Sequence, residues 1–294
     1  MKKFTIYDIN AREVRPIEIG KFPGGEIRVK IATVPIEMLH NVRITAVLLN
    51  SDDVMTLVMI VDALREMGVE DIRLTMPYIP YARQDRVCNT GEAFSIRAFA
   101  NIINALEFKS IIVWDAHSVI STCLIKNCIN IPQSDLIGKH VELMKWMVES
   151  TDPIYLVAPD AGSVRKATEI AQTYPTLIRD VLYAEKVREL STGKIIATRI
   201  ASQLPDDFGT SRVLICDDIC DGGRTFIELA KVLNDYNPKE MSLYVTHGIF
   251  SQGLEVLRKP GTPEAEYKIT REGRPGNTGL FDNVWCSLNF KDYK

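Results

Sequence analysis

The chain has 294 residues, which is enough for two domains of ordinary size. Its 46% hydrophobic and 25% charged residues are ordinary for a soluble globular protein, and a net charge of −3 gives no signal for nucleic-acid or membrane binding. We expect no membrane span and no signal peptide, and the six cysteines, which include no CxxC pair, predict a cytoplasmic protein with reduced thiols.

Short apolar runs alternate along the chain with helical patterns. The predicted strands are 44–49, 72–78, 111–114, 154–158, 213–216, 243–246 and 283–289. The predicted helices are 54–67, 95–106, 139–149, 163–173 and 225–234. This alternation is typical of α/β proteins with mainly parallel sheets flanked by helices.

Two similar halves are predicted, with a boundary in the loop-like stretch 131–138. We therefore expect domains at residues 1–138 and 139–294. The stretch 258–279 is rich in Pro, Gly and charge, so we interpret it as an exposed excursion before the last strand.

Polar loops follow five of the predicted strands. They read IPYARQDR, DAHS, PDAGS, DDICDGGRT and HGIFS. In open α/β sheets, ligands bind outside the carboxyl ends of the strands. One such loop would be explained as solvated surface, but five of them favour a binding site.

The loop after the fifth of these strands has the clearest chemistry. Asp217 and Asp218 follow an apolar run directly, and Asp221, Gly222 and Gly223 come before a helical pattern. Adjacent carboxylates at the end of a buried strand repel each other unless hydroxyl groups or a cation lie between them. The backbone N–H groups of a glycine turn and a helix N-terminus bind phosphate. This combination predicts a site for a phosphorylated sugar.

Taken together, the motifs resemble those of ribose-phosphate pyrophosphokinases. MPYIPYARQDR, VWDAHS, LVAPDAGSVRKA, CDDICDGGRT and YVTHGIFS occur in the order of that family, and the resemblance extends over residues 21–251. It implies an N-terminal ATP-side domain and a C-terminal domain with the ribose-phosphate loop, both phosphoribosyltransferase-like. The implied reaction moves the β,γ-diphosphate of ATP to the C1 hydroxyl of ribose 5-phosphate, releases AMP and needs Mg²⁺.

The resemblance also implies roles for residues on the ATP side. Phe22 and Glu26, in FPGGE, match an adenine-binding loop that reaches the ATP site of a neighbouring subunit, which implies a homo-oligomer. For Phe22, packing in the core is the alternative interpretation. Arg83 and Gln84 match ATP contacts, and His117 matches a catalytic residue and metal ligand.

The remaining implied roles fall in the second half of the chain. Asp160 matches a metal ligand, and Lys186 and Arg188 match a mobile catalytic loop that closes over the transferring group. The implied acceptor-binding residues are Asp217, Asp218, Asp221, Gly222, Gly223, Arg224 and Thr225.

Arg224 departs from the family pattern, which has a small residue in this place. A guanidinium there crowds a compact monoester pocket or binds an additional phosphate. The second possibility leads to an alternative acceptor, ADP-ribose, with ADP-ribose 1-diphosphate as the product and a role in NAD synthesis. A non-catalytic regulatory paralogue is a further alternative.

Overall fold

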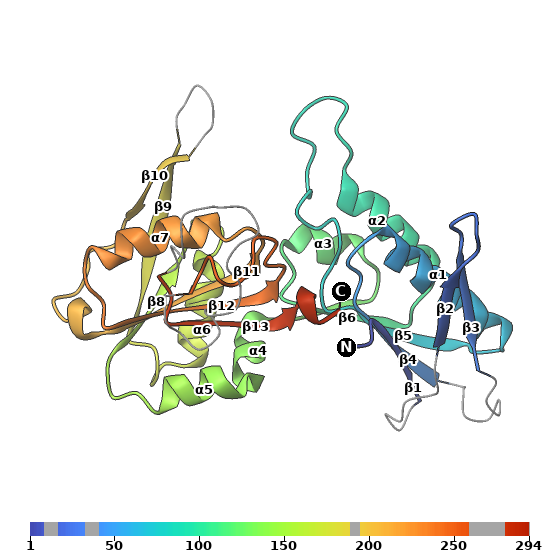
Figure 1. The fold of residues 1–294 in the computed structure, drawn as a ribbon, viewed down its shortest axis with the longest axis horizontal. Helices are drawn as coiled ribbons and strands as arrows, with labels where there is room; N and C mark the ends of the chain where they lie inside the picture. The colour runs from blue at the N-terminus through green and yellow to red at the C-terminus, as the bar shows by residue number, and fades with distance from the viewer. Residues whose placement is uncertain (9–16, 33–40, 189–194, 259–279, 294) are drawn as a thin grey trace. The chain divides into compact units, whose positions relative to one another are not determined.

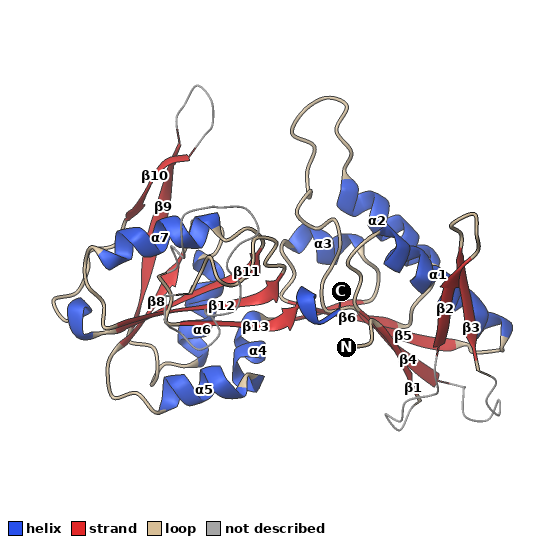
Figure 2. Cartoon of the chain, viewed as in Figure 1, coloured by secondary structure: helices blue, strands red, loops and turns tan. Residues whose placement is uncertain are grey.

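In a computed structural model of the chain, the structure describes residues 1–8, 17–32, 41–188, 195–258 and 280–293. The chain divides into two compact units (Figure 1): unit 1 is Met1–Pro132 with Asp292–Lys294, and unit 2 is Gln133–Lys291. Each unit contains a mainly parallel sheet with α-helices packed against it, so the predicted α/β class is confirmed (Figure 2). In the described part of the chain, no helix has the length and apolar character needed to cross a membrane.

Unit 1 is built on a five-stranded sheet in the order β1-β4-β5-β6-β7. Strand β1 pairs antiparallel with β4, and the other pairs are parallel. The strands are β1 (Phe4–Tyr7), β4 (Asn41–Ala46), β5 (Asp71–Thr75), β6 (Ser110–Trp114) and β7 (Cys128–Ile131). Strands β2 (Ile17–Lys21) and β3 (Ile27–Ile31) form a separate antiparallel hairpin. The helices are α1 (Ser51–Glu66), α2 (Ser95–Ala105) and α3 (Val119–Leu124).

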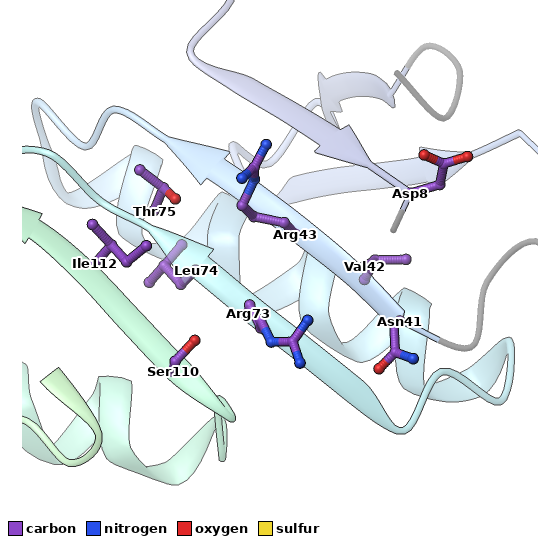
Figure 3. Close-up of a pocket in the computed structure, with 9 residues that line it drawn as sticks. All are labelled: Asp8, Asn41, Val42, Arg43, Arg73, Leu74, Thr75, Ser110 and Ile112. Atoms are coloured by element: carbon purple, nitrogen blue, oxygen red, sulfur yellow. The ribbon is translucent and has the colours of Figure 1, made fainter. Parts of the chain in front are cut away.

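Helices α1 and α2 bury their apolar faces against one face of this sheet. Leu57 and Ile60 of α1 and Phe99 of α2 belong to the same buried cluster as Ile44 and Leu74 of the sheet. Side chains alternate between the two faces of a strand. The neighbouring residues in β4 and β5 therefore lie on the opposite face, where polar side chains line a cavity of about 170 Å³ (Figure 3). Its lining includes Asn41, Arg43, Arg73, Thr75 and Ser110.

Unit 2 is built on a six-stranded sheet in the order β10-β9-β8-β11-β12-β13. The β9–β10 pair is antiparallel and the others are parallel. The strands are β8 (Ile154–Ala158), β9 (Asp180–Arg188), β10 (Ile195–Ile200), β11 (Arg212–Cys220), β12 (Glu240–Gly248) and β13 (Asn283–Asn289). The helices are α4 (Gln133–Lys139), α5 (Val141–Val148), α6 (Val164–Thr173) and α7 (Arg224–Asn234).

Both faces of the unit 2 sheet are covered by helices. On one face, Leu229 and Leu233 of α7 belong to the same buried cluster as Val213 of β11. On the other face, helices α4, α5 and α6 share a cluster with Leu214 and Tyr244. Consecutive side chains of β11 point to opposite faces of the sheet, and helices cover both faces. A continuous run of apolar residues therefore fits this strand. Figure 1 shows α7 on one side of the sheet and α5 on the other.

The structure corrects the prediction of a loop over residues 131–138. Most of this stretch is helix α4, whose Gln133, Ser134, Leu136 and Ile137 are buried. The polar residues at its start were interpreted as loop residues, but they make buried hydrogen bonds instead. The chain divides into its two units after Pro132. The predicted excursion over residues 258–279 lies outside the described residues, apart from its first position.

Candidate functional site

The acidic pair lies inside strand β11 and not after its end. The prediction ended this strand at Cys216, but pairing with β12 continues to Cys220, which lies opposite Gly248. Asp218 is only 6% exposed, and its backbone N–H donates to Asp217 Oδ1 over 2.9 Å. The prediction was wrong because sheet pairing satisfies the backbone there, whatever charge the side chains carry.

Burial and neighbouring charges act on Asp217. Burial is the largest cause that raises the pKa of its carboxyl, and the charges of Asp218 and Asp160 raise this pKa further. Three carboxylates that act on one another in this way favour a cation or hydroxyl donors among them. The electrostatics therefore fit the predicted binding of sugar hydroxyls.

Lys166 joins this group, although its sequence context did not predict a role for it. Its Nζ lies 3.8 Å from Asp218 Oδ2, and the two side chains are 19% and 9% exposed. Lys166 lies in the first turn of α6, within the LVAPDAGSVRKA motif. The motif contained the signal, because its basic residues follow the Asp160 loop directly, but the partner on β11 is distant in sequence.

The glycine turn after β11 is short. Gly223 has a φ of 77°, in the left-handed region, and it immediately precedes α7, which begins at Arg224. A Cβ atom at Gly223 would lie 2.8 Å from Leu257 Cδ2, so glycine is required both by its backbone angle and by this close approach. The Ser251 N–H donates to the Asp221 carbonyl oxygen over 3.1 Å, which joins the HGIFS loop to this turn.

Residues Asp221 to Thr225 thus bring a glycine turn and a helix N-terminus together, which is the geometry of the predicted phosphate site. The first N–H groups of a helix have no partner within the helix, and the helix dipole favours an anion beside them. Arg224 is exposed at the first helical position, and Gly222 and Thr225 are half-buried.

The Asp160 loop follows β8, the parallel neighbour of β11. Asp160 Oδ1 accepts from the N–H groups of Gly162 and Ser163, over 3.1 and 3.2 Å. These bonds hold the carboxylate in a defined direction at the carboxyl end of the sheet. Its charge is one of those that raise the pKa of Asp217.

The donor groups of this site suit a metal ion that substrate and water also hold. Within the described ranges, no group of three or more His, Cys, Asp or Glu side chains is arranged to hold a metal ion on its own. Mg²⁺ is usually bound through one or two carboxylates together with water and substrate phosphates. The mutually repelling carboxylates of Asp160, Asp217 and Asp218 fit that mode of binding.

The predicted ATP-side residues lie on loops of unit 1. Arg83 and Gln84 follow β5 and His117 follows β6, and all three side chains are exposed. Strands β5 and β6 are parallel neighbours, so both loops begin at the same edge of the sheet. Gln84 accepts a hydrogen bond from the Ser95 hydroxyl at the start of α2.

The segment Phe22–Glu26 is the tip of the β2–β3 hairpin. The N–H of Phe22 donates to the carbonyl oxygen of Glu26 over 2.9 Å, and the N–H of Gly25 donates to the carbonyl oxygen of Phe22 over 2.8 Å. The Phe22 side chain is 51% exposed, so the alternative that it packs in the core is wrong. An exposed aromatic ring on a projecting hairpin is available for stacking.

Lys186 and Arg188 were predicted on a loop, but their backbone belongs to strand β9. Lys186 pairs with Thr198 and Arg188 with Ile195 in the β9–β10 hairpin. The two residues lie next to positions 189–194, which are outside the described residues. Figure 1 shows this hairpin extending away from the rest of the unit 2 sheet.

Comparison with protein families gives two matches. Residues 5–106 match the model described as the N-terminal domain of ribose phosphate pyrophosphokinase, and residues 133–274 match the phosphoribosyl transferase domain.

Individual relatives agree with these matches. The ribose-phosphate pyrophosphokinase of Thermococcus kodakarensis is 28% identical over 249 residues, which cover 82% of this chain and 80% of the relative. That of Pyrococcus abyssi is also 28% identical, over 81% of this chain and 78% of the relative. The crystal structure of phosphoribosylpyrophosphate synthetase from Mycobacterium smegmatis has the same fold, with a TM-score of 0.67 and 18% identity over 92% of this chain and 86% of that chain.

Proposed function

Since the chain belongs to the ribose-phosphate pyrophosphokinase family, whose members are transferases, we propose that it moves the β,γ-diphosphate of ATP to the C1 hydroxyl of ribose 5-phosphate. The products are phosphoribosyl diphosphate and AMP. The observation that carries the proposal is the continuity of the acidic pair, the glycine turn and the start of α7 on one segment of chain.

This segment supports both parts of the acceptor. The phosphate of ribose 5-phosphate lies on the N–H groups of Gly222, Gly223 and the first turn of α7. The ring hydroxyls donate to the carboxylates of Asp217 and Asp218. Asp221 and Thr225 complete the cradle on either side of the glycines.

Transfer of the diphosphate depends on positioning and on positive charge. The group in flight carries dispersed negative charge, and the protein's task is to hold donor and acceptor in line. Lys186 and Arg188, at the end of β9, supply cations for that group. Arg83 and Gln84 hold ATP, and His117 lies on the loop that follows the neighbouring strand.

Magnesium is the cofactor that the proposal requires. When bound, it neutralises charge on the ATP phosphates. Asp160 would hold the ion, and the family resemblance assigns His117 to metal binding as well. Asp160 is directed for this role by its two backbone hydrogen bonds.

A homo-oligomer is part of the proposal. The exposed Phe22 ring and Glu26, at the tip of the β2–β3 hairpin, bind the adenine of ATP held by a neighbouring subunit. Stacking accounts for an aromatic ring that the chain's own core does not use.

The test is an assay of AMP release from ATP and Mg²⁺ with ribose 5-phosphate as the acceptor. Lys186→Ala is expected to lower kcat by at least about 100-fold with little change in KM, because this cation acts on the transition state. The matched control is Arg199→Ala on the same hairpin, whose exposed side chain pairs with Glu185 at 2.9 Å. Wild-type protein that releases no AMP with any acceptor would refute the enzyme and favour the regulatory paralogue.

Arg224 supports a second acceptor, ADP-ribose. Its exposed guanidinium lies at the first position of α7, where an acceptor with a diphosphate would present its additional phosphate. We propose comparing kcat/KM for the two acceptors in the wild type and in Arg224→Thr. If ADP-ribose is the acceptor, the variant loses activity with it and keeps activity with ribose 5-phosphate. A wild type that prefers ribose 5-phosphate would exclude this acceptor.

A further inference from the structure

Gln133 is a buried amide beneath the acidic pair. It is the first residue of α4 and is 3% exposed. Its Nε2 donates to the Asp217 carbonyl oxygen over 2.5 Å and to Thr246 Oγ1 over 3.0 Å. Asp217 belongs to β11 and Thr246 to β12, so one amide group joins α4 to two adjacent strands.

The orientation of this amide follows from its partners. A backbone carbonyl oxygen only accepts hydrogen bonds, so the atom facing Asp217 is the NH₂ group of Gln133. The amide oxygen, Oε1, is then buried without a hydrogen-bond partner among the described residues. An apolar side chain of the same size would avoid this unsatisfied oxygen, but it would also remove the donor to the Asp217 carbonyl and to Thr246. The amide therefore holds β11 and β12 through its NH₂ group while its own oxygen is left without a hydrogen bond.

The bonds lie at the level of the acidic pair. In the β11–β12 register, Asp217 is opposite Val245 and Ile219 is opposite His247, which places Thr246 level with Asp218. The Asp217 carboxylate is itself oriented by the Asp218 N–H. Holding the carbonyl of Asp217 fixes the peptide plane that carries this N–H, and thereby the direction of the carboxylate.

We infer that Gln133 is a positioning residue that orients Asp217 toward the sugar hydroxyls of the acceptor. The inference rests on the proposed function of this site. It acts through Asp217 and not by contact with substrate, so its loss should weaken acceptor binding and leave ATP binding unchanged. Interactions of this outer kind typically contribute about 10–100-fold.

The test is Gln133→Met, which keeps the volume and length of the side chain and removes the donor. We expect KM for ribose 5-phosphate to rise by about 10-fold or more, with KM for ATP within about two-fold of the wild type. The matched control is Ser134→Ala on the same helix, because Ser134 is equally buried at 3% and bonds to Glu169, away from β11. Equal acceptor KM values in Gln133→Met and the wild type would overturn the inference.

A second measurement does not need activity. Hydrogen exchange at the Asp218 amide, which donates to Asp217, should be faster in Gln133→Met than in Ser134→Ala. Unchanged exchange would overturn the inference even for an inactive protein. If the wild type released no AMP but Gln133→Met still showed faster exchange at the Asp218 amide, the proposed function would be rejected. The positioning of Asp217 by Gln133 would then still stand. Gln133→Leu serves the same measurements if the methionine variant does not fold.

Discussion

At the scale of single residues, the site is a balance of charges that are buried or half-buried. Asp217 and Asp218 are adjacent and repel each other, and Lys166 lies near the second of them. The sequence predicted the two carboxylates and their role as a pair. It did not predict Lys166 as their neighbour, because the contact depends on the packing of α6 beside β11. Removing one charge at a time should reveal this balance.

The first prediction concerns pH and Asp217→Asn. Because the pKa of Asp217 is raised, its folded form holds the proton more tightly than the unfolded chain does. The wild type therefore loses stability as pH rises from the ordinary carboxyl range through the raised pKa, and the asparagine variant does not. We expect the variant to have the higher Tm at about pH 7.5, with a difference that shrinks toward about pH 4.

Thermal unfolding across this pH range, in metal-free buffer, measures the effect. Asp206→Asn, at an exposed position, is the control and should follow the wild type at every pH. A Tm difference for Asp217→Asn that stays constant with pH would contradict the raised pKa.

The second prediction concerns Lys166→Met. Removing the ammonium leaves Asp218, 9% exposed at its side chain, without this counter-charge. We expect the free energy of unfolding to fall by about 2 kcal/mol, since removing a nearby positive charge from a buried carboxylate is costly. Urea unfolding at neutral pH is the measurement. The control is Lys231→Met, which removes an exposed ion pair with Glu228 and should lower the free energy of unfolding by less than about 0.5 kcal/mol. An equal loss of stability in both variants would argue against a special contribution from the burial of the Lys166–Asp218 pair.

At the scale of elements, strands end where pairing ends and not where the apolar residues end. The predicted strands 154–158 and 283–289 agree with β8 and β13. Strand β11 is longer than its apolar run because β12 pairs with it through the acidic residues. Neither the β9–β10 hairpin nor α4 was predicted: the resemblance assigned Lys186 and Arg188 of β9 to a loop, and α4 begins with polar residues. In both, tertiary contacts override the local pattern.

The third prediction tests the turn between β11 and α7. Gly223→Ala places a Cβ at a φ of 77° and 2.8 Å from Leu257 Cδ2. We expect the free energy of unfolding to fall by about 1–3 kcal/mol because of the strained backbone and the close contact. Gly222→Ala is the control, since its Cβ would make an ordinary 3.6 Å contact with Gln252 Cγ, and it should change stability by less than about 0.5 kcal/mol. Equal stability losses from chemical denaturation would refute the distinction.

At the scale of the whole molecule, the chain consists of two units with separate cores. One buried cluster lies in unit 1, and two clusters cover the two faces of the unit 2 sheet. Each unit thus has the apolar interior of an independent domain. The residues predicted for the ATP side lie in unit 1, and those proposed to bind the acceptor lie in unit 2.

The fourth prediction follows from these separate cores. A fragment of residues 133–291 should fold without unit 1 and unfold cooperatively in urea. The urea concentration at the midpoint of unfolding should not change when ATP is added. The reason is that, apart from Lys186 and Arg188 on β9, the residues assigned to ATP lie in unit 1. Circular dichroism across a urea titration is the measurement. A fragment without a cooperative transition would show that unit 2 depends on unit 1.

The sequence by itself determined the α/β class, the order of the motifs and the carboxylates of the proposed acceptor site. These features depend on residues that are neighbours along the chain, so composition, spacing and resemblance are enough to predict them. Only the tertiary structure decided that Lys166 lies beside Asp218 and that Gln133 joins α4 to β11 and β12. Contacts of this kind arise from the packing of helices on a sheet, which brings together residues that no local pattern relates.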